Sequence, residues 1–141
     1  MKSFGEQLPN IQYLPRIGSY AVIIENERIA VIKSPRLNAY FLIGGGLDEG
    51  ESEQEGLERE ALEEIGYKIK VHQKIGAATE YFYAEIDEKY FAKECHFYRC
   101  ELIEKVSDSA ERELIWLTAE NINDIYHDCH QWIDRQELNS K

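Results

Sequence analysis

The sequence predicts an α/β fold: one domain over residues 1–141, built as an α/β/α sandwich around a mixed β-sheet. Two observations predict this architecture. Strand-like segments come before and after a helical segment, and a second helical segment follows the last of them. Helices and strands in this order pack as helices on the faces of a sheet. With 141 residues, of which 43% are hydrophobic, the chain is long and apolar enough for one core.

Seven segments have the composition and alternation of strands. They are residues 19–25, 28–33, 39–43, 67–71, 77–85, 90–102 and 113–117. The third strand runs into Gly44, Gly45 and Gly46, which predict a tight turn and allow a close approach of the backbone to a ligand. Residues 1–16 are expected to form a partly ordered N-terminal arm. Thr118 is expected to cap a final helix that extends toward Trp132.

The first helix has clear signals at both ends. Ser52 and Glu55 have the spacing of a capping box, so the helix is expected to begin at Glu53. Gly66 supplies the left-handed residue that commonly ends a helix. Apolar residues at four-residue steps give the helix a stripe to bury. They are Leu57, Ala61 and Ile65.

Acidic residues are concentrated on this helix and on the segment before it. Between Asp48 and Glu64 there are nine acids and one base, Arg59, so this segment carries −8 of the total net charge of −11. Glu60, Glu63 and Glu64 fall on one helix face, where like charges cost about 0.2–0.5 kcal/mol per pair. A hard divalent cation, Mg²⁺ or Mn²⁺, would turn this repulsion into binding. The alternative is a solvated glutamate-rich face.

The same segment carries a longer pattern. It resembles the Nudix box, G-x5-E-x7-R-E-U-x-E-E-x-G-U, in which U is a bulky aliphatic residue, and it meets every charged and glycine position. The matching residues are Gly45, Glu51, Arg59, Glu60, Glu63, Glu64 and Gly66. Ala61 and Tyr67 depart from the aliphatic positions, and Ile43 stands where the family often has proline. These departures affect packing and turn rigidity and leave the chemistry intact, so the chain is similar to the Nudix (MutT-like) hydrolases.

The resemblance implies roles for the residues of the box. The ligands of Mg²⁺, or of Mn²⁺, would be Glu60, Glu63 and Glu64. Glu60 would also help to activate the attacking water. Arg59 would orient the carboxylates by charge-assisted hydrogen bonds, together with Glu51. Gly44 and Gly45 would shape the loop that holds the helix against the substrate diphosphate.

Further candidates lie outside the box. Lys33 and Arg36 leave the second strand toward the expected site and are candidate phosphate ligands, with solvated loop charges as the alternative. Tyr83 lies sixteen residues beyond the end of the box, a spacing that resembles the tyrosine of Nudix enzymes that cleave dinucleoside polyphosphates. Glu111 and Glu113 lie where other members contribute a further carboxylate, so either is a candidate ligand or base.

The function implied by the resemblance is metal-dependent hydrolysis of a phosphoanhydride bond in a nucleoside diphosphate linked to another moiety. A nucleoside triphosphate or a dinucleoside polyphosphate is the favoured substrate. The alternative is a nucleotide-binding regulatory module on a Nudix scaffold. Because no charged position of the box is replaced, the enzyme is favoured over the module.

Composition argues against several other classes of protein. A pI near 4.8 without a basic patch argues against binding to nucleic-acid polymers. No apolar run approaches the roughly 20 residues that span a bilayer, so no membrane association is expected. Cys95, Cys100 and Cys129 are odd in number and lack the paired spacing of a zinc site, which suits reduced thiols in the cytoplasm. A homodimer is compatible with these residues but is not indicated by them.

Overall fold

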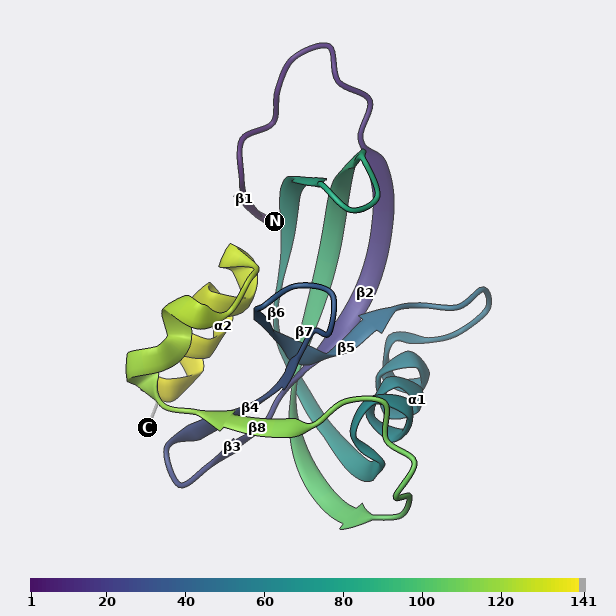
Figure 1. Cartoon of the computed structure of the whole chain (residues 1–141), viewed down its shortest axis with the longest axis vertical. Coiled ribbons are helices and arrows are strands. Elements are labelled where there is room, and N and C mark those ends of the chain that lie inside the picture. Colours follow the sequence, from purple (N-terminus) through teal and green to yellow (C-terminus); the bar gives the residue numbers. More distant parts are fainter. Residues whose placement is uncertain (140–141) are drawn as a thin grey trace.

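The computed structural model describes residues 1–139. In chain order the elements are β1 (Lys2–Phe4), β2 (Leu14–Val22), β3 (Ile24–Glu25), β4 (Arg28–Lys33), β5 (Tyr40–Gly46), α1 (Glu53–Ile65), β6 (Tyr67–Ala84), β7 (Lys89–Lys105), β8 (Leu114–Leu117), a 3-10 helix (Ala119–Asp124) and α2 (Asp128–Asn139). The predicted α/β class is confirmed, since α1 and α2 flank one mixed eight-stranded sheet (Figure 1). No helix in the described part of the chain is long and apolar enough to cross a membrane.

The sheet combines parallel and antiparallel pairs. Its strand order is β1-β6-β7-β2-β5-β4-β3, and β8 pairs with β4. Two pairs, β1 with β6 and β2 with β7, are parallel, and the other pairs are antiparallel. β6 and β7 form a long twisted hairpin that stands upright in Figure 1, with β2 along its side.

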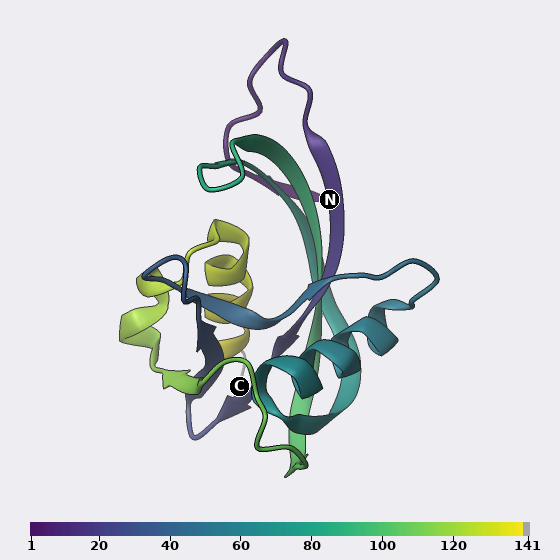
Figure 2. The same cartoon turned by 45° about the vertical axis from the view of Figure 1, so that its right-hand side comes forward.

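The two faces of the sheet bury separate cores, as the alternation of the central strand requires. Tyr20 and Val22 point to one face and pack in the core under α2. Ala21 and Ile23 point to the other face and pack in the core under α1. Figure 2 shows the two helices on opposite sides of the sheet, which is the predicted sandwich.

α1 begins and ends where the sequence predicts. The Ser52 hydroxyl accepts a hydrogen bond from the Glu55 backbone, and the Glu55 carboxylate accepts one from the Ser52 backbone, so the capping box is confirmed. Gly66 ends the helix at a φ of 72°, and a side chain there would meet the carbonyl oxygen of Ser107 at 2.3 Å. The predicted apolar stripe is buried; it consists of Leu57, Ala61 and Ile65.

The glycine run is part of a strand, which corrects the prediction of a glycine-rich turn. Gly44 and Gly45 belong to β5 and pair with Tyr20 and Ser19 of β2. Gly44 has a φ of 144°, and a Cβ there would lie 2.2 Å from the Ser19 carbonyl oxygen. The glycines therefore permit close pairing of two strands. The connection to α1 follows at residues 47–52.

Other strands are longer than predicted. Residues 67–71 and 77–85 join into the single strand β6, because irregular pairing near Val71 and Lys74 bends the strand without ending it. The N-terminal arm of residues 1–16 is also shorter, since β2 already begins at Leu14 and β1 pairs with β6. These pairings join residues far apart in the chain, which local alternation does not record.

The final helix is interrupted, which is a second correction. Thr118 precedes a 3-10 helix over Ala119–Asp124 and makes no side-chain capping bond to it. α2 begins only after a break. The break has a tertiary cause, because the Tyr126 N–H donates to the Tyr40 carbonyl oxygen of β5 at 2.9 Å.

α2 buries a carboxylate that the fold leaves without a partner. Asp134 is fully buried, and neither of its carboxylate oxygens has a hydrogen-bond partner among residues 1–139. Burial raises the pKa of Asp134 well above its usual range. The folded protein therefore keeps a proton that the unfolded chain releases above about pH 4. This group consequently lowers the stability of the protein as the pH rises above that value.

Asp134→Asn is expected to raise the free energy of unfolding at pH 8 by about 1–3 kcal/mol, because an amide costs less to bury than a carboxylate. At pH 4 the gain should be much smaller, since the buried aspartate is then protonated in both states for much of the population. Urea denaturation at the two pH values measures the difference. An equal gain at both, or a loss at pH 8, contradicts this account of Asp134.

Candidate active site

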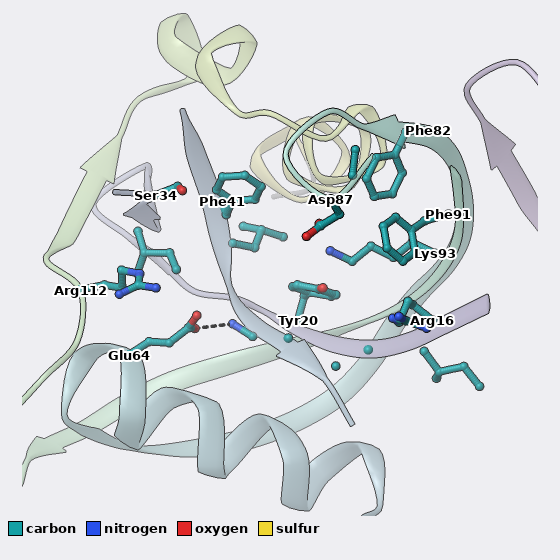
Figure 3. A pocket seen from close by; sticks show the side chains of 18 residues that line it. Arg16, Tyr20, Ser34, Phe41, Glu64, Phe82, Asp87, Phe91, Lys93 and Arg112 are labelled. Atoms are coloured by element: carbon teal, nitrogen blue, oxygen red, sulfur yellow. Dashed lines mark hydrogen bonds between the residues drawn. The ribbon is translucent and has the colours of Figure 1, made fainter. Parts of the chain in front are cut away.

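α1 lies beside the glycine end of β5 and presents two carboxylates to it. The Gly44 N–H donates to Glu64 Oε1 at 2.9 Å, the bond drawn in Figure 3. The Glu60 carboxylate lies over Gly45, where an added Cβ would be 3.0 Å from it. Because both glycines lack a side chain, helix and strand come close enough for these contacts. The Gly44 N–H thus binds Glu64, and the missing side chain of Gly45 leaves room for the Glu60 carboxylate.

Arg59 joins several carboxylates of the acidic segment. Its Nε and Nη2 donate to the two oxygens of Glu51 at 2.7 and 3.0 Å, which is a bidentate pair. Nη1 donates to Glu60 at 3.0 Å and to Glu63 at 3.2 Å, and Nη2 also donates to the Gly46 carbonyl oxygen. The guanidinium therefore joins the acidic connection, the helix and the end of β5 in one network. The partners of Arg59 include Glu51 and Glu60, as expected from the sequence.

The acids of the site differ in their affinity for protons. Burial raises the pKa of Glu64 to about 8, although the bond from Gly44 opposes the shift. Burial also raises the pKa of Glu60, against the influence of Arg59. Hydrogen bonds from Arg59 and from the backbone lower the pKa of Glu51 to about 2. The site thus combines one firmly ionised carboxylate with two whose ionised forms are disfavoured by burial.

Glu60, Glu63 and Glu64 share a helix face without converging. Within residues 1–139 their carboxylates are not gathered within 4.8 Å of one another. Arg59 binds the first two, and Gly44 binds the third. The donor set consists of carboxylate oxygens, which Mg²⁺ and Mn²⁺ prefer. A hard divalent ion would suit this donor set, since it would favour the ionised forms of Glu60 and Glu64 that burial opposes.

A cavity of about 480 Å³ opens beside Glu64 (Figure 3). The glycine end of β5 forms one side of it. Four aromatic rings, those of Tyr20, Phe41, Phe82 and Phe91, line its walls. A cavity of this size, with aromatic walls and a few polar groups, is typical of a site for a small molecule.

Three cations line the cavity, and sequence reasoning singled out none of them. They are Arg16, Lys93 and Arg112. In a protein of net charge −11, three cations around one cavity favour an anionic ligand. A signal for Lys93 was present, because it lies on the same face of β7 as the buried residues Phe91 and Cys95. Arg16 lay in the predicted arm, where no pattern marked it.

The predicted phosphate ligands lie elsewhere. Lys33 and Arg36 line a separate hollow and not the cavity beside Glu64. The alternation of β4 explains Lys33, since its neighbours Ile32 and Ser34 are the ones that line the cavity. Tyr83 lies with Arg36 in an adjoining hollow. Contacts of Lys33, Arg36 or Tyr83 with a substrate stay predictions.

The segment before β8 packs on the end of α1. The Glu111 N–H donates to the Glu63 carbonyl oxygen at 3.0 Å, and the Arg112 N–H donates to that of Glu64 at 2.8 Å. The charges of Glu111 and Arg112 both act on the Glu64 carboxylate. Glu111 is thus placed where it can join the acidic cluster, and a role for Glu113 stays a prediction.

A second cluster of metal-binding residue types lies in the core. Cys95, Cys129 and His130 are fully buried, and their ligand atoms lie within 4.8 Å of one another. The two sulfur atoms are 3.9 Å apart. The charge of Lys93 acts on both thiols. A second cation there would be repelled by this ammonium, which favours a packing role for the cluster.

Fold and site together define a class of protein: an α/β sandwich in which one helix sets a carboxylate cluster beside a cavity lined by aromatic rings and cations. The model of the NUDIX domain matches residues 15–138. The chain therefore belongs to the NUDIX domain family, as its resemblance to the Nudix box predicts.

Three relatives illustrate the likeness. The Bacillus subtilis (strain 168) protein named "Putative 8-oxo-dGTP diphosphatase" is 37% identical over 60 residues, which span 42% of this chain and 40% of that protein. The MutT protein from Methanosarcina mazei Go1 superimposes with a TM-score of 0.69 at 21% identity, over 94% of this chain and 100% of that chain. The E. coli ORF135 protein gives a TM-score of 0.68 at 16% identity, over 96% of both chains. At these identities the two structures show a shared fold.

Proposed function

We propose that this chain hydrolyses a phosphoanhydride bond in a nucleoside diphosphate linked to another moiety. One observation carries the proposal: the carboxylates of α1, ordered by Arg59, lie beside a cavity that combines aromatic rings with cations. Aromatic rings suit a nucleobase, cations suit phosphates and carboxylates suit a hard metal ion. Membership of the NUDIX domain family supports the same reaction.

The proposed cofactor is Mg²⁺, with Mn²⁺ as the second choice, held by Glu60, Glu63 and Glu64. When bound, such an ion neutralises phosphate charge and activates water. The chain itself positions the groups, since Arg59 fixes Glu60 and the Gly44 N–H fixes Glu64. Glu60 is also a candidate base. Glu111 is the second candidate, because its charge already acts on Glu64.

The proposed substrate is a nucleoside triphosphate or a dinucleoside polyphosphate. The relation to a protein named as an 8-oxo-dGTP diphosphatase adds oxidised purine nucleoside triphosphates to the panel. Arg16 and Arg112 line the cavity and suit the phosphates. Lys33, Arg36 and Tyr83 would contact the parts of a longer substrate that extend beyond the cavity.

Product release from a panel of nucleotides tests this function. Purified protein is incubated with nucleoside triphosphates, 8-oxo-dGTP, dinucleoside polyphosphates and nucleotide sugars, with Mg²⁺, with Mn²⁺ or with a chelator. We expect turnover of at least one compound that depends on the metal and stops in chelator. Turnover in the chelator would contradict the metal assignment.

A nucleotide-binding regulatory module is the second candidate. It is favoured by one outcome of the same panel, in which nucleotides bind tightly and none is turned over. The bonds from Arg59 to Glu51 and Glu60 argue for the enzyme, because a binding module has no need of an ordered carboxylate network.

Gly45→Ala is expected to lower kcat about tenfold and leave the melting temperature nearly unchanged. The new methyl group would lie 3.0 Å from the Glu60 carboxylate, which is the flexible end of a side chain and can move away. A shift of this kind misplaces a reacting group without unfolding the protein. Gly46→Ala is the matched control, since its nearest neighbour would be 3.9 Å away. Equal effects of the two substitutions on kcat would contradict the proposed role of the Glu60 contact.

The remaining assignments belong to the same proposal. Cys95, Cys100 and Cys129 are free thiols in the part of the chain that the structure describes, which suits the cytoplasm. A small-molecule nucleotide, not a nucleic-acid polymer or a membrane, is the proposed partner. A homodimer stays a prediction, to be checked by light scattering.

A further inference from the structure

Lys93 is set into the wall of the cavity, and in the described part of the chain no ion pair joins it to a carboxylate. Its side chain leaves β7, and its ammonium points into the cavity above the ring of Tyr20, 4.8 Å from the ring centroid (Figure 3). Within residues 1–139 no carboxylate oxygen lies within 4.0 Å of Lys93 Nζ in an ion pair. A cation so placed gains from a ligand that accepts hydrogen bonds.

A chain of hydrogen bonds holds this ammonium from behind. Glu80 Oε2 lies 2.8 Å from His127 Nδ1, and the Cys129 N–H donates to Glu80 Oε1 at 2.8 Å. The ionised Glu80 can only accept, so His127 Nδ1 carries the proton and Nε2 is left as an acceptor. Nε2 lies 3.5 Å from Lys93 Nζ. His127 therefore takes one hydrogen of the ammonium and the Tyr20 hydroxyl takes a second, which leaves the third for the cavity.

The surroundings of Lys93 fit a nucleobase. Phe41, Phe82 and Phe91 line the same cavity, and bases stack on such rings whatever their identity. Stacking alone therefore does not choose among the bases. Asp87 also points into the cavity (Figure 3), where its carboxylate can accept a hydrogen bond. A donor and an acceptor that both line a stacking site can read the edge of a base.

We propose that Lys93 selects the base of the substrate: it donates a hydrogen bond to the ring carbonyl of a guanine-type purine, and Glu80 and His127 position it. The proposal rests on the proposed function, because it takes the cavity as the site of the nucleoside. Lysine has three donors and no acceptor. It complements the O6 and N7 acceptors of guanine and opposes the amino group that adenine presents at the same place. Asp87 can accept from the ring N–H beside the guanine carbonyl.

The test removes the two partners of the hydrogen bond separately: a substitution removes the Lys93 ammonium, and a base analogue removes the guanine O6. kcat/KM is measured for GTP, for ATP and for 2-aminopurine riboside triphosphate, which lacks O6, with wild type, Lys93→Met and Lys89→Met. Lys89 is an exposed lysine of the same strand and serves as the matched control. Wild type and Lys89→Met should prefer GTP to the 2-aminopurine compound by about 10- to 100-fold, because hydrogen bonds to charged groups contribute on that scale. Lys93→Met should reduce this ratio at least fivefold. Any preference that remains comes from the ring N–H, which the 2-aminopurine compound also lacks and which Asp87 can accept.

The ratio for Lys93→Met and the ratio for wild type can each overturn the proposal. A folded Lys93→Met that keeps the wild-type ratio overturns the proposal. If Lys93→Met does not fold, a wild-type ratio near one overturns it and a ratio of tenfold or more supports it. Glu80→Gln tests the positioning role, since it should raise KM for GTP about three- to tenfold and leave kcat unchanged. A fall in kcat with KM unchanged would contradict that role.

Failure of this proposal is distinguishable from failure of the proposed function. Hydrolysis of all three nucleotides at equal kcat/KM leaves the hydrolase in place and overturns the selection by Lys93. If wild type hydrolyses none of them, calorimetric binding of GMP and of 2-aminopurine riboside monophosphate replaces the kinetics. Tighter binding of GMP, lost in Lys93→Met, then supports Lys93 as the selecting residue, and equal binding overturns it.

Discussion

Replacing Glu64 by glutamine is expected to lower kcat of the proposed hydrolysis about 100- to 1,000-fold while the protein stays folded. Glu64 is the most deeply placed of the three glutamates, held by the Gly44 N–H at 2.9 Å, and glutamine keeps the oxygen that accepts this bond. What is lost is the negative charge that a divalent ion needs. Glu104→Gln is the control, since Glu104 is an exposed acid of β7 outside the site.

The same substitution has a second expected effect, on stability. The pKa of Glu64 in the metal-free folded protein is about 8, above its ordinary value of 4.5. Between these values the folded state holds a proton that the unfolded chain has released, so Glu64 lowers stability as the pH rises through this window. Metal-free Glu64→Gln should therefore unfold at a higher denaturant concentration than wild type at pH 8. A variant that is inactive because it is unfolded would contradict both expectations.

Arg59→Lys is expected to lower kcat/KM about 10- to 100-fold, although it keeps the positive charge. Lysine cannot reproduce the bidentate pair with Glu51 while also reaching Glu60 and Glu63. The carboxylates would then lose their common orientation. The melting temperature should fall by only about 2–5 °C, because the network is partly exposed to solvent.

The control for Arg59→Lys is Arg135→Lys on α2, which lies outside the cavity and the acidic network. Steady-state kinetics and thermal unfolding of both variants are compared with wild type. Wild-type kinetics for Arg59→Lys would show that charge alone is needed at this position. The role of the guanidinium in orienting the carboxylates would then be wrong.

Local signals account for what the sequence predicted well. The start of α1 depends on Ser52 and Glu55, and its end on Gly66, all within one segment. The acidic cluster lies on the same helix, so its shared face follows from helical periodicity. These features need no knowledge of the rest of the chain.

Non-local contacts account for what the sequence did not predict. Gly44 and Gly45 read as a turn because their pairing with β2 is invisible in their own segment. The final helix breaks near Tyr126 because that residue bonds to Tyr40 of β5. Such partners are set by tertiary packing, which overrides local preference.

The cations of the cavity also depend on non-local contacts. Lys33 and Arg36 were candidates because they leave the second strand toward the expected site. Arg16 and Lys93 instead reach the cavity from β2 and β7, whose parallel pairing is not visible in the local sequence. The alternation of β7 could have identified Lys93. A lysine on the same strand face as buried residues is unusual and indicates a specific role.

Direct binding of Mn²⁺ tests most closely whether the carboxylates of α1 hold a divalent metal ion. Electron paramagnetic resonance counts the Mn²⁺ bound to wild type, Glu64→Gln and Glu104→Gln in the presence of a non-hydrolysable nucleotide. We predict bound Mn²⁺ in wild type and Glu104→Gln, and at least tenfold weaker binding in folded Glu64→Gln. Equal Mn²⁺ binding by all three proteins would contradict the account.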